Sequence, residues 1–567
     1  MKLTTFHLGT AVGAAVLAAA CSSGQDEQGE VVLEFSVEAE ASRFLARATF
    51  GATPEAVETF TTLGDERWLE QQLALPATEI VPALSGQGCF LELGDGNCPD
   101  WLEELRRLHN LRTELWWQRA LYAPDQLRQR VAFALTEIFV VSERGDFMFA
   151  YPLLLADYHD MLARGAFGTY RELLEEVTLH PAMGIYLSMC KNQKPDEVTG
   201  SRPDENFARE VMQLFSIGLE LLNPDGSAIL DEFGRPVPTY DQDVVVGMAR
   251  ALTGWNFRGT PPASTPKQWD ESLGLLGRME PDPTRHDTDP KLLVGGYEAP
   301  GGLSPEEDLA LVLDLLAGHP NVGPFLGRRL IQRLVTSNPS PEYIARISAV
   351  FEDDGEGVRG NLGAVVTAIL TDDEARSGGE QAPETFGKVR EPILRLTALF
   401  RAFEARAQDG RVQLHWATGA LNQGHFQSPS VFNFFLPDFA PIGPVGDAGL
   451  VAPELQITTH TFINRVGNFL AWMVFDHYEG SDCEGCEAPL LDYAEAAELA
   501  AHPAHLVDYL DAMLLGGTLS EGSREVVLEY LREIPYDEAG VHAPPGYSRV
   551  LEAVHLLVVS PEFSVQK

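Results

Sequence analysis

Apolar residues recur at helical spacing along almost the whole chain, and this pattern limits the fold more than any other feature of the sequence. In the segment 124–142, Leu127, Val131, Leu135 and Phe139 follow one another at four-residue steps, with the charged residues off the stripe. Such spacing is typical of an amphipathic helix. Comparable patterns predict further helices at 39–47, from Thr53 and Pro54 onwards, and at 100–121, 152–164, 169–176, 182–189, 204–222, 241–253, 305–317, 321–335, 341–351, 361–370, 385–408, 413–421, 455–475, 491–500, 504–514, 520–532 and 546–558.

Strand-like alternation is rare. The segment 226–240 is the best candidate for a short hairpin, because the dipeptides at Gly226 and Gly234 are typical of tight turns. Two long segments rich in proline and glycine, 256–303 and 422–453, predict loops that cover one face of the bundle, and loops of this length are often functional. The sequence therefore predicts an all-α fold, a large multi-helix bundle with a small β-hairpin insertion and long covering loops.

The first twenty residues are typical of a secretion signal. Lys2 gives a short basic start, and the apolar run from 10 to 20 is about half the length that a bilayer span needs. The run ends at Cys21, and this arrangement resembles the bacterial lipobox, although Ala18 stands where that motif usually has leucine. The expectation is a lipid-anchored protein with lipid on Cys21, and a plain cleaved signal is the alternative.

The predicted organisation has four parts. A signal peptide at 1–20 is followed by a flexible tether at 21–36, whose polar composition favours an extended chain. A main helical domain is expected at 37–476. An acidic, cysteine-bearing loop at 477–490 begins a C-terminal helical unit, 477–567, that packs on the main domain.

Charge excludes one class of partner. The chain has 41 basic and 83 acidic residues, a formal net charge of −42, and such a field repels phosphate backbones. General nucleic-acid binding is therefore not expected.

The six cysteines are consistent with an oxidising compartment. Cys89 with Cys98, and Cys483 with Cys486, are each close in sequence and lie in acidic, loop-like segments, so two local disulfides are expected. A zinc site made from these four is the alternative. Cys190 follows an apolar helical pattern and is expected to be a buried free thiol.

Several stretches of the chain form a distinctive set. They include LRQRVAFALTEIFVVS at 127–142, PDENFAREVMQLFSIGLELLN at 203–223, HPNVGPFLGRRLIQRLVTSNPSPEYIARI at 319–347 and SPSVFNFFLPDF at 428–439. Together they resemble the bacterial DUF1800 family. The resemblance implies an exported, mainly helical protein with no settled activity. It also implies a neighbour of the DUF1501 type, which resembles the alkaline-phosphatase and sulfatase class. No catalytic residue is carried over, and the lipobox-like start departs from members with twin-arginine signals.

The densest cluster of charged side chains lies at 204–210. Glu205 and Arg209 are one helical turn apart, and Glu210 lies about 100° further round the helix than Arg209. If this cluster is buried, Arg209 would clamp Glu205 while Glu210 faces a ligand or a histidine. A helix-surface ion pair is the alternative.

Histidines supply the other candidates for catalysis. His180 precedes a proline at a predicted helix start, and His286 and Asp287 lie in a long loop near Lys291. Imidazole with carboxylate suits a general base or a metal ligand, but isolated histidines are more often structural.

Two functions remain open. One is a non-catalytic envelope scaffold, membrane-anchored and facing the periplasm or the exterior, that binds a DUF1501-like partner. The other is an extracytoplasmic hydrolase of cell-surface or imported polymer that uses Glu205, Arg209, Glu210, His180, His286 and Asp287. The sequence has no Gly-x-Ser-x-Gly, phosphate-binding loop or dinucleotide fingerprint, so it assigns neither a cofactor nor a reaction.

Overall fold

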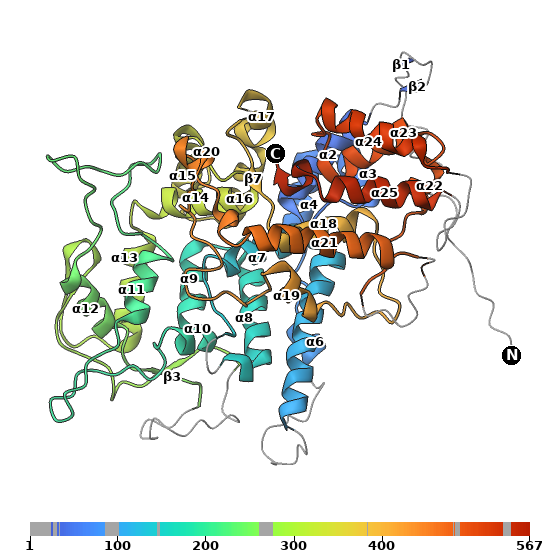
Figure 1. Cartoon of the computed structure of the whole chain (residues 1–567). Coiled ribbons are helices and arrows are strands. Elements are labelled where there is room, and N and C mark those ends of the chain that lie inside the picture. Colours follow the sequence, from blue (N-terminus) through green and yellow to red (C-terminus); the bar gives the residue numbers. More distant parts are fainter. Residues whose placement is uncertain are drawn as a thin grey trace. The chain divides into compact units, whose positions relative to one another are not determined.

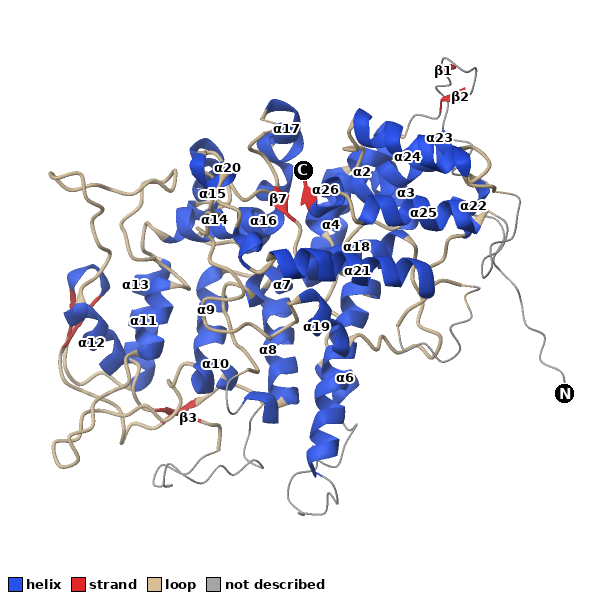
Figure 2. Ribbon diagram, viewed as in Figure 1, coloured by secondary structure: helices blue, strands red, loops and turns tan. Residues whose placement is uncertain are grey.

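The computed structural model describes residues 24–25, 31–32, 35–85, 101–144, 148–259, 276–382, 384–479, 481, 488–536 and 546–567. Helices dominate these residues, and the strands form only small two-stranded pairs (Figures 1 and 2). The predicted all-α class with a small β component is confirmed.

The chain divides into two compact units. Unit 1 contains the described residues up to Gly64 together with 390–411 and 463–566, and unit 2 contains 65–389 and 412–462. The segment 477–567 thus belongs to a unit that also contains the first described helices. The proposed domain boundary at 477–490 stays a prediction.

Unit 1 is built from short helices around an apolar core that includes Leu45, Leu510 and Val554. Its elements are β1 (Gly24–Gln25), β2 (Val31–Val32), α2 (Ser36–Ala48), α3 (Pro54–Leu63), α18 (Pro392–Ala402), most of α21 (His460–Asp476), α22 (Ala494–Glu498), α23 (Pro503–Leu510), the π-helical turn η6 (Asp511–Leu515), α24 (Glu521–Glu533), α25 (Tyr547–Val558), α26 (Pro561–Ser564) and β8 (Val565–Gln566).

Unit 2 contains the longer helices, among which α6, α7 and α8 pack against one another (Figure 1). Its elements are α4 (Asp65–Ala74), α5 (Val81–Leu84), α6 (Trp101–Tyr122), α7 (Gln126–Thr136), η2 (Met148–Ala150), α8 (Pro152–Gly165), α9 (Tyr170–Leu179), α10 (Pro181–Tyr186), α11 (Asn206–Gln213), α12 (Gln242–Ala251), β3 (Trp255–Asn256), β4 (Glu280–Pro281), β5 (Lys291–Leu293), η3 (Val294–Gly296), β6 (Tyr297–Ala299), α13 (Pro305–Ala317), α14 (Val322–Leu334), α15 (Pro341–Glu352), α16 (Leu362–Thr371), α17 (Asp373–Gln381), β7 (Lys388–Val389), η4 (His415–Ala417), α19 (Thr418–Leu421), α20 (Pro444–Asp447) and η5 (Pro453–Gln456).

Local capping explains where many helices begin. The Thr53 side chain accepts a hydrogen bond from the backbone N–H of Ala56, and Pro54 occupies the first turn of α3, as the sequence predicted. Reciprocal capping boxes start α9 and α13, with Thr169 and Ser304 as the caps. These signals are local, so they can be recognised in the sequence without the fold.

α7 differs from the predicted amphipathic helix because it is buried on every side. All eleven of its residues are buried, including Arg128 and Arg130. Their guanidinium groups donate to backbone carbonyls, Arg128 to Ala163 and Leu75, and Arg130 to Arg333. A buried charge is tolerated when it is hydrogen-bonded in this way.

The predicted helix 204–222 is much shorter in the structure. α11 ends at Gln213, and Gly218 then adopts a positive φ of 71°. A Cβ at Gly218 would lie only 3.1 Å from the Phe325 ring, so glycine suits both the turn and the close approach. From here the chain forms antiparallel bridges between Glu220 and Pro238, Leu222 and Ala228, and Leu230 and Pro236. The hairpin expected at 226–240 is confirmed, but its pairing begins at Glu220, inside the segment predicted as a helix.

Among the described residues, no single helix is long and apolar enough to cross a membrane. The consecutive helices α13 and α14, which meet at a bend of 71°, reach the necessary length and hydropathy only when taken together.

Candidate functional site

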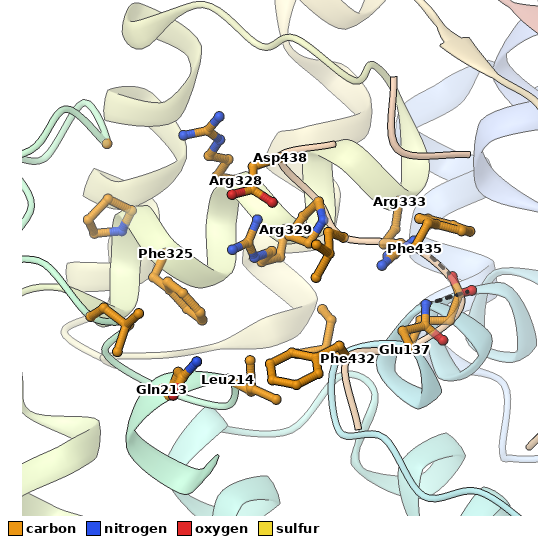
Figure 3. A pocket seen from close by; sticks show the side chains of 18 of the residues that line it. Glu137, Gln213, Leu214, Phe325, Arg328, Arg329, Arg333, Phe432, Phe435 and Asp438 are labelled. Carbon is orange, nitrogen blue, oxygen red and sulfur yellow. Dashed lines mark hydrogen bonds and ion pairs between the residues drawn. The ribbon is translucent and has the colours of Figure 1, made fainter. Parts of the chain in front are cut away.

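A cavity of about 420 Å³ in unit 2 is the best-formed site among the described residues (Figure 3). Its volume lies within the range of small-molecule pockets. Four segments line it, namely the end of α7 from Glu137, the turn after α11 with the start of the hairpin, α14, and residues 431–438. These are parts of the four sequence stretches quoted above for the family resemblance.

Three arginines of α14 line the cavity. Arg329 and Arg333 are four residues apart and therefore lie on one face of the helix, with Arg328 beside them. The aromatic rings of Phe325, Phe432 and Phe435 also line the cavity. Three carboxylates, Glu137, Glu220 and Asp438, also line the cavity, so its formal charges balance although the chain as a whole is strongly acidic.

Arg333 is held in place by the surrounding protein. Its Nη1 lies 3.5 Å from Oε2 of Glu137, and its guanidinium lies over the Phe435 ring at 4.5 Å. The side-chain amide of Asn433 donates to the other oxygen of Glu137. In addition, Gln332 donates to the Pro437 carbonyl. These contacts attach the 431–438 segment to α7 and α14, and they form one rigid wall of the cavity.

Arg329 and Arg328 have no comparable partners. Arg329 donates only a long, 3.4 Å hydrogen bond to Gln332 and lies over Phe325 at 5.1 Å. The Nε of Arg328 is buried without a hydrogen-bond partner. Neither guanidinium forms an ion pair with any residue that the structure describes. Asp438, which is exposed, lies beside them in Figure 3 and acts on both only through its charge.

Burial makes the positive charges of these arginines unfavourable. Burial, followed by the charges of Arg328 and Arg333, lowers the pKa of Arg329 to about 9, and Asp438 only partly opposes this. Burial likewise lowers the pKa of Arg328. At pH 7 both groups stay cationic, so an anion placed between them would relieve both the desolvation and the mutual repulsion. The arrangement suits binding of an anion, and it contains neither a thiol nor a histidine that could attack one.

The six residues predicted as a site do not line this cavity. Glu205 and Arg209 form a partly exposed ion pair of 3.1 Å, with 36% and 39% of the side chains exposed, and Gln242 joins them. This geometry is that of a helix-surface pair, which contributes little stability. Glu210, by contrast, is buried, its Oε2 has no hydrogen-bond partner, and burial raises its pKa against the opposing charge of Arg209.

The predicted histidines are each engaged elsewhere. Nδ1 of His180 accepts a hydrogen bond from the Ala182 N–H and so caps α10, as the sequence suggested. Its Nε2 lies 3.3 Å from Asp157. Burial opposes ionisation of Asp157, but the hydrogen bond and charge of His180 outweigh it and lower the pKa of that carboxyl.

His286 belongs to a buried cluster of charged groups. Its Nε2 lies 2.9 Å from Oδ2 of Asp308, and Nζ of Lys291 lies 2.6 Å from the same oxygen. The other ring nitrogen faces the carbonyl of Thr253. The side chains of His286, Lys291 and Asp308 are almost fully buried, and they connect the 286–291 loop to α13 as a structural cluster.

Asp287, next to His286, points to a different partner. It receives two hydrogen bonds from Arg250, of 2.7 and 3.0 Å. Burial would raise the pKa of Asp287, but Arg250 overcomes this effect and lowers it. The catalytic roles assigned to the six predicted residues stay predictions, since each residue other than Glu210 has its own structural partner.

A family model described as "Protein of unknown function (DUF1800)" matches residues 43–565, a span that includes every segment lining the cavity. The chain belongs to the DUF1800 family. The resemblance seen in the sequence is therefore confirmed. No curated protein and no solved structure is significantly similar to the chain.

This DUF1800 protein also contains a buried polar network that the sequence analysis missed. Arg112 on α6 donates to Glu143 at 2.6 Å and approaches Nδ1 of His425 at 3.5 Å. His425 and His159 share a hydrogen bond of 3.1 Å, and His159 continues to Gln129. Because arginine can only donate, the chain has one direction, with each histidine accepting at Nδ1 and donating from Nε2.

The histidines of this network are kept neutral. Burial, then the charges of Arg112 and Arg119, lowers the pKa of His159 to about 3. Burial and the charges of His159 and Arg112 lower the pKa of His425 well below its usual value. The His425 ring stacks on Trp116, with 4.7 Å between the ring centroids. The neighbouring Phe426 has a φ of 60°, a conformation that non-glycine residues adopt only under constraint. The network thus fixes the loop that leads to the cavity wall.

Neither the arginines nor this network could be found from spacing alone. The only available signal for the cavity was the Arg328-Arg329 pair with Arg333 four residues later, in an otherwise acidic chain. Among the described residues, no group of three or more histidine, cysteine, aspartate or glutamate side chains is placed to hold a metal ion.

The cysteines of the DUF1800 protein are only partly described. Cys190 is a free thiol in the structure, and burial raises its pKa to about 12. Cys21, Cys89, Cys98, Cys483 and Cys486 lie outside the described residues. Their lipidation and disulfide pairing therefore stay predictions.

Proposed function

We propose that this DUF1800 protein is a lipid-anchored binding protein of the bacterial envelope, facing the periplasm or the exterior, and that its arginine-lined cavity holds an anionic ligand. The observation that carries the proposal is the state of Arg328 and Arg329, two guanidinium groups at a cavity wall without an ion pair from the described protein. Partly buried cations without an ion pair favour an incoming anion.

Three further features support binding rather than chemistry at this cavity. Arg333 is already neutralised by Glu137, and the wall around it is fixed by hydrogen bonds to Asn433 and Gln332. A fixed wall lowers the entropic cost of ligand binding. The cavity also lacks a histidine or cysteine among its lining residues.

The test is a comparison of the native protein with Arg329→Gln. Thermal unfolding is measured while sulfate, phosphate, acetate or benzoate is added at constant ionic strength. At least one of these anions should raise the melting temperature of the native protein in a saturable manner, and the effect should disappear in Arg329→Gln.

Arg346→Gln is the matched control, because Arg346 is half exposed on the neighbouring helix α15 and does not line the cavity. It should respond to the anions as the native protein does. The proposal is refuted if no anion stabilises the native protein, or if Arg329→Gln responds equally.

For the cellular role, we propose that a neighbouring DUF1501-like protein, of the sulfatase or phosphatase class, is the partner of this scaffold. The support is the family membership and the anchor expected at Cys21. Co-purification from detergent-solubilised membranes tests this role. The proposed role is refuted if the anchored chain is recovered without that partner although both proteins are present in the membranes.

A further inference from the structure

We infer that the ligand of the cavity is a monocarboxylate whose single charge is joined to an apolar or aromatic body. This inference rests on the proposed function and narrows it. Two properties of the lining lead to it, two guanidinium groups without an ion pair and a set of large apolar side chains beside them.

The charge of the lining disfavours a ligand with several negative charges, because three carboxylates balance its three arginines. Three arginines face the cavity, but Glu137 is paired with Arg333, and Asp438 acts on Arg328 and Arg329. Glu220, exposed on the wall formed by the hairpin, adds a further negative charge without an ion pair to these arginines. A ligand with several negative charges would meet these three carboxylates and the acidic protein around them, so repulsion disfavours it.

Arg329 is the group best placed to receive that charge. It has no ion pair among the described residues, and Figure 3 shows its guanidinium on the cavity side of α14, near Phe325. A guanidinium presents a planar fork of donors that matches a carboxylate with two parallel hydrogen bonds. Arg328, with its buried unsatisfied Nε, adds a second positive charge nearby.

Apolar side chains from three segments form another part of the wall. Phe325 comes from α14, Leu214 and Leu219 from the turn after α11, and Phe432 and Leu436 from the 431–438 segment. Leu219, Phe432 and Leu436 are 55%, 44% and 39% exposed, unusually high for large apolar side chains beside a cavity. An apolar ligand body would cover them and gain from the area removed from water.

Gly218 maintains the space for such a body. Its φ of 71° would be strained for any other residue, and a Cβ there would lie only 3.1 Å from the Phe325 ring. The glycine therefore lets the hairpin and α14 approach while the Phe325 ring keeps its position at the wall.

The ligand chemistry has two possible sources, a free aryl- or alkyl-carboxylic acid and the C-terminal carboxylate of a peptide that ends in a hydrophobic residue. Both present one carboxylate next to an apolar group. The experiment therefore contains an arm for each.

Calorimetric titration of the full-length protein measures the affinity for 3-phenylpropionate, its neutral amide, acetate and phenyl phosphate, and for a tripeptide ending in phenylalanine with a free or amidated C-terminus. The free acid, the free-carboxylate peptide, or both should bind at least tenfold tighter than the matching amide, acetate and phenyl phosphate. Arg329→Gln should lose about ten- to hundredfold in affinity, the range of a hydrogen-bonded charge. Arg346→Gln should bind as the native protein does.

A second variant tests the apolar wall. Leu219→Ser changes an exposed side chain, so it should fold normally, and it should weaken binding of 3-phenylpropionate while leaving acetate unchanged. If phosphate or sulfate binds in an Arg329-dependent manner but the hydrophobic carboxylates show no preference, this inference fails and the proposed anion site stands. If no anion of either panel binds, both fail.

Discussion

Acidification should weaken unit 2 through its buried histidine pair, and His159 allows the size of the effect to be worked out. The pKa of His159 in the folded protein is about 3, against a usual value of 6.5. Because the folded-state pKa is lower, the unfolded chain binds the proton first. The free energy of unfolding therefore falls as the pH drops below about 6.5, and the loss ends only near pH 3. Between pH 7 and pH 5, His159 alone should account for about 2 kcal/mol.

The perturbation that isolates this effect is His159→Gln. A glutamine amide retains a donor and an acceptor for His425 and Gln129 but does not titrate. Urea unfolding is measured at pH 7 and pH 5 by tryptophan fluorescence, because Trp116 stacks on the His425 ring. The free energy of unfolding of the native protein should fall by about 2 kcal/mol more than that of the variant. The many carboxylates affect both proteins alike, so the difference between them reports the histidine.

His460→Gln, which removes an exposed histidine, serves as the control and should keep the pH response of the native protein. If His159→Gln does not fold, the exchange rate of the His159 ring C–H, followed by mass spectrometry against pH, measures the same pKa directly in the native chain. Equal losses for the native protein and the variant, or a His159 pKa near 6.5, would refute the assignment of a neutral buried pair.

Further predictions concern four other places in the chain. Glu210→Gln should raise the free energy of unfolding at pH 7, because burial raises the pKa of Glu210 and makes its charged form unfavourable. Denaturation experiments should show this gain shrinking as the pH falls toward the usual pKa of a glutamate. The absence of a gain at pH 7 would contradict the prediction. Lys291→Met should lower the free energy of unfolding in urea by about 3–5 kcal/mol, since it leaves the buried Asp308 carboxylate without its cation. A loss below about 1 kcal/mol would contradict a structural role for this ion pair. Cys21→Ser should release the protein from the membrane fraction without unfolding it, so equal fractionation of both forms would exclude the lipid anchor. Non-reducing peptide mapping should find Cys89 linked to Cys98, a small loop worth about 2–3 kcal/mol, and free thiols at both would exclude the disulfide.

The candidate site shows which features a local sequence pattern can predict and which it cannot. The sequence suggested that Glu205, Arg209 and Glu210 form a functional cluster because charges concentrate there. In the structure, Glu205 and Arg209 pair with each other at a partly exposed position, whereas Glu210 is buried without that pair. Helical spacing tells which residues share a face, but it does not tell whether that face meets solvent, because the covering elements come from elsewhere in the chain.

The sequence by itself determined the helical class, the position of most helices and the family. Apolar spacing and caps such as Thr53 act within a few residues, so they are visible without tertiary information. Only the tertiary structure decided which charges are buried and which meet. His159 and His425 are 266 residues apart, and the cavity joins α14 to a segment about a hundred residues later. The physical reason is that desolvation and ion pairing depend on neighbours brought together by packing, which no local pattern of residues specifies.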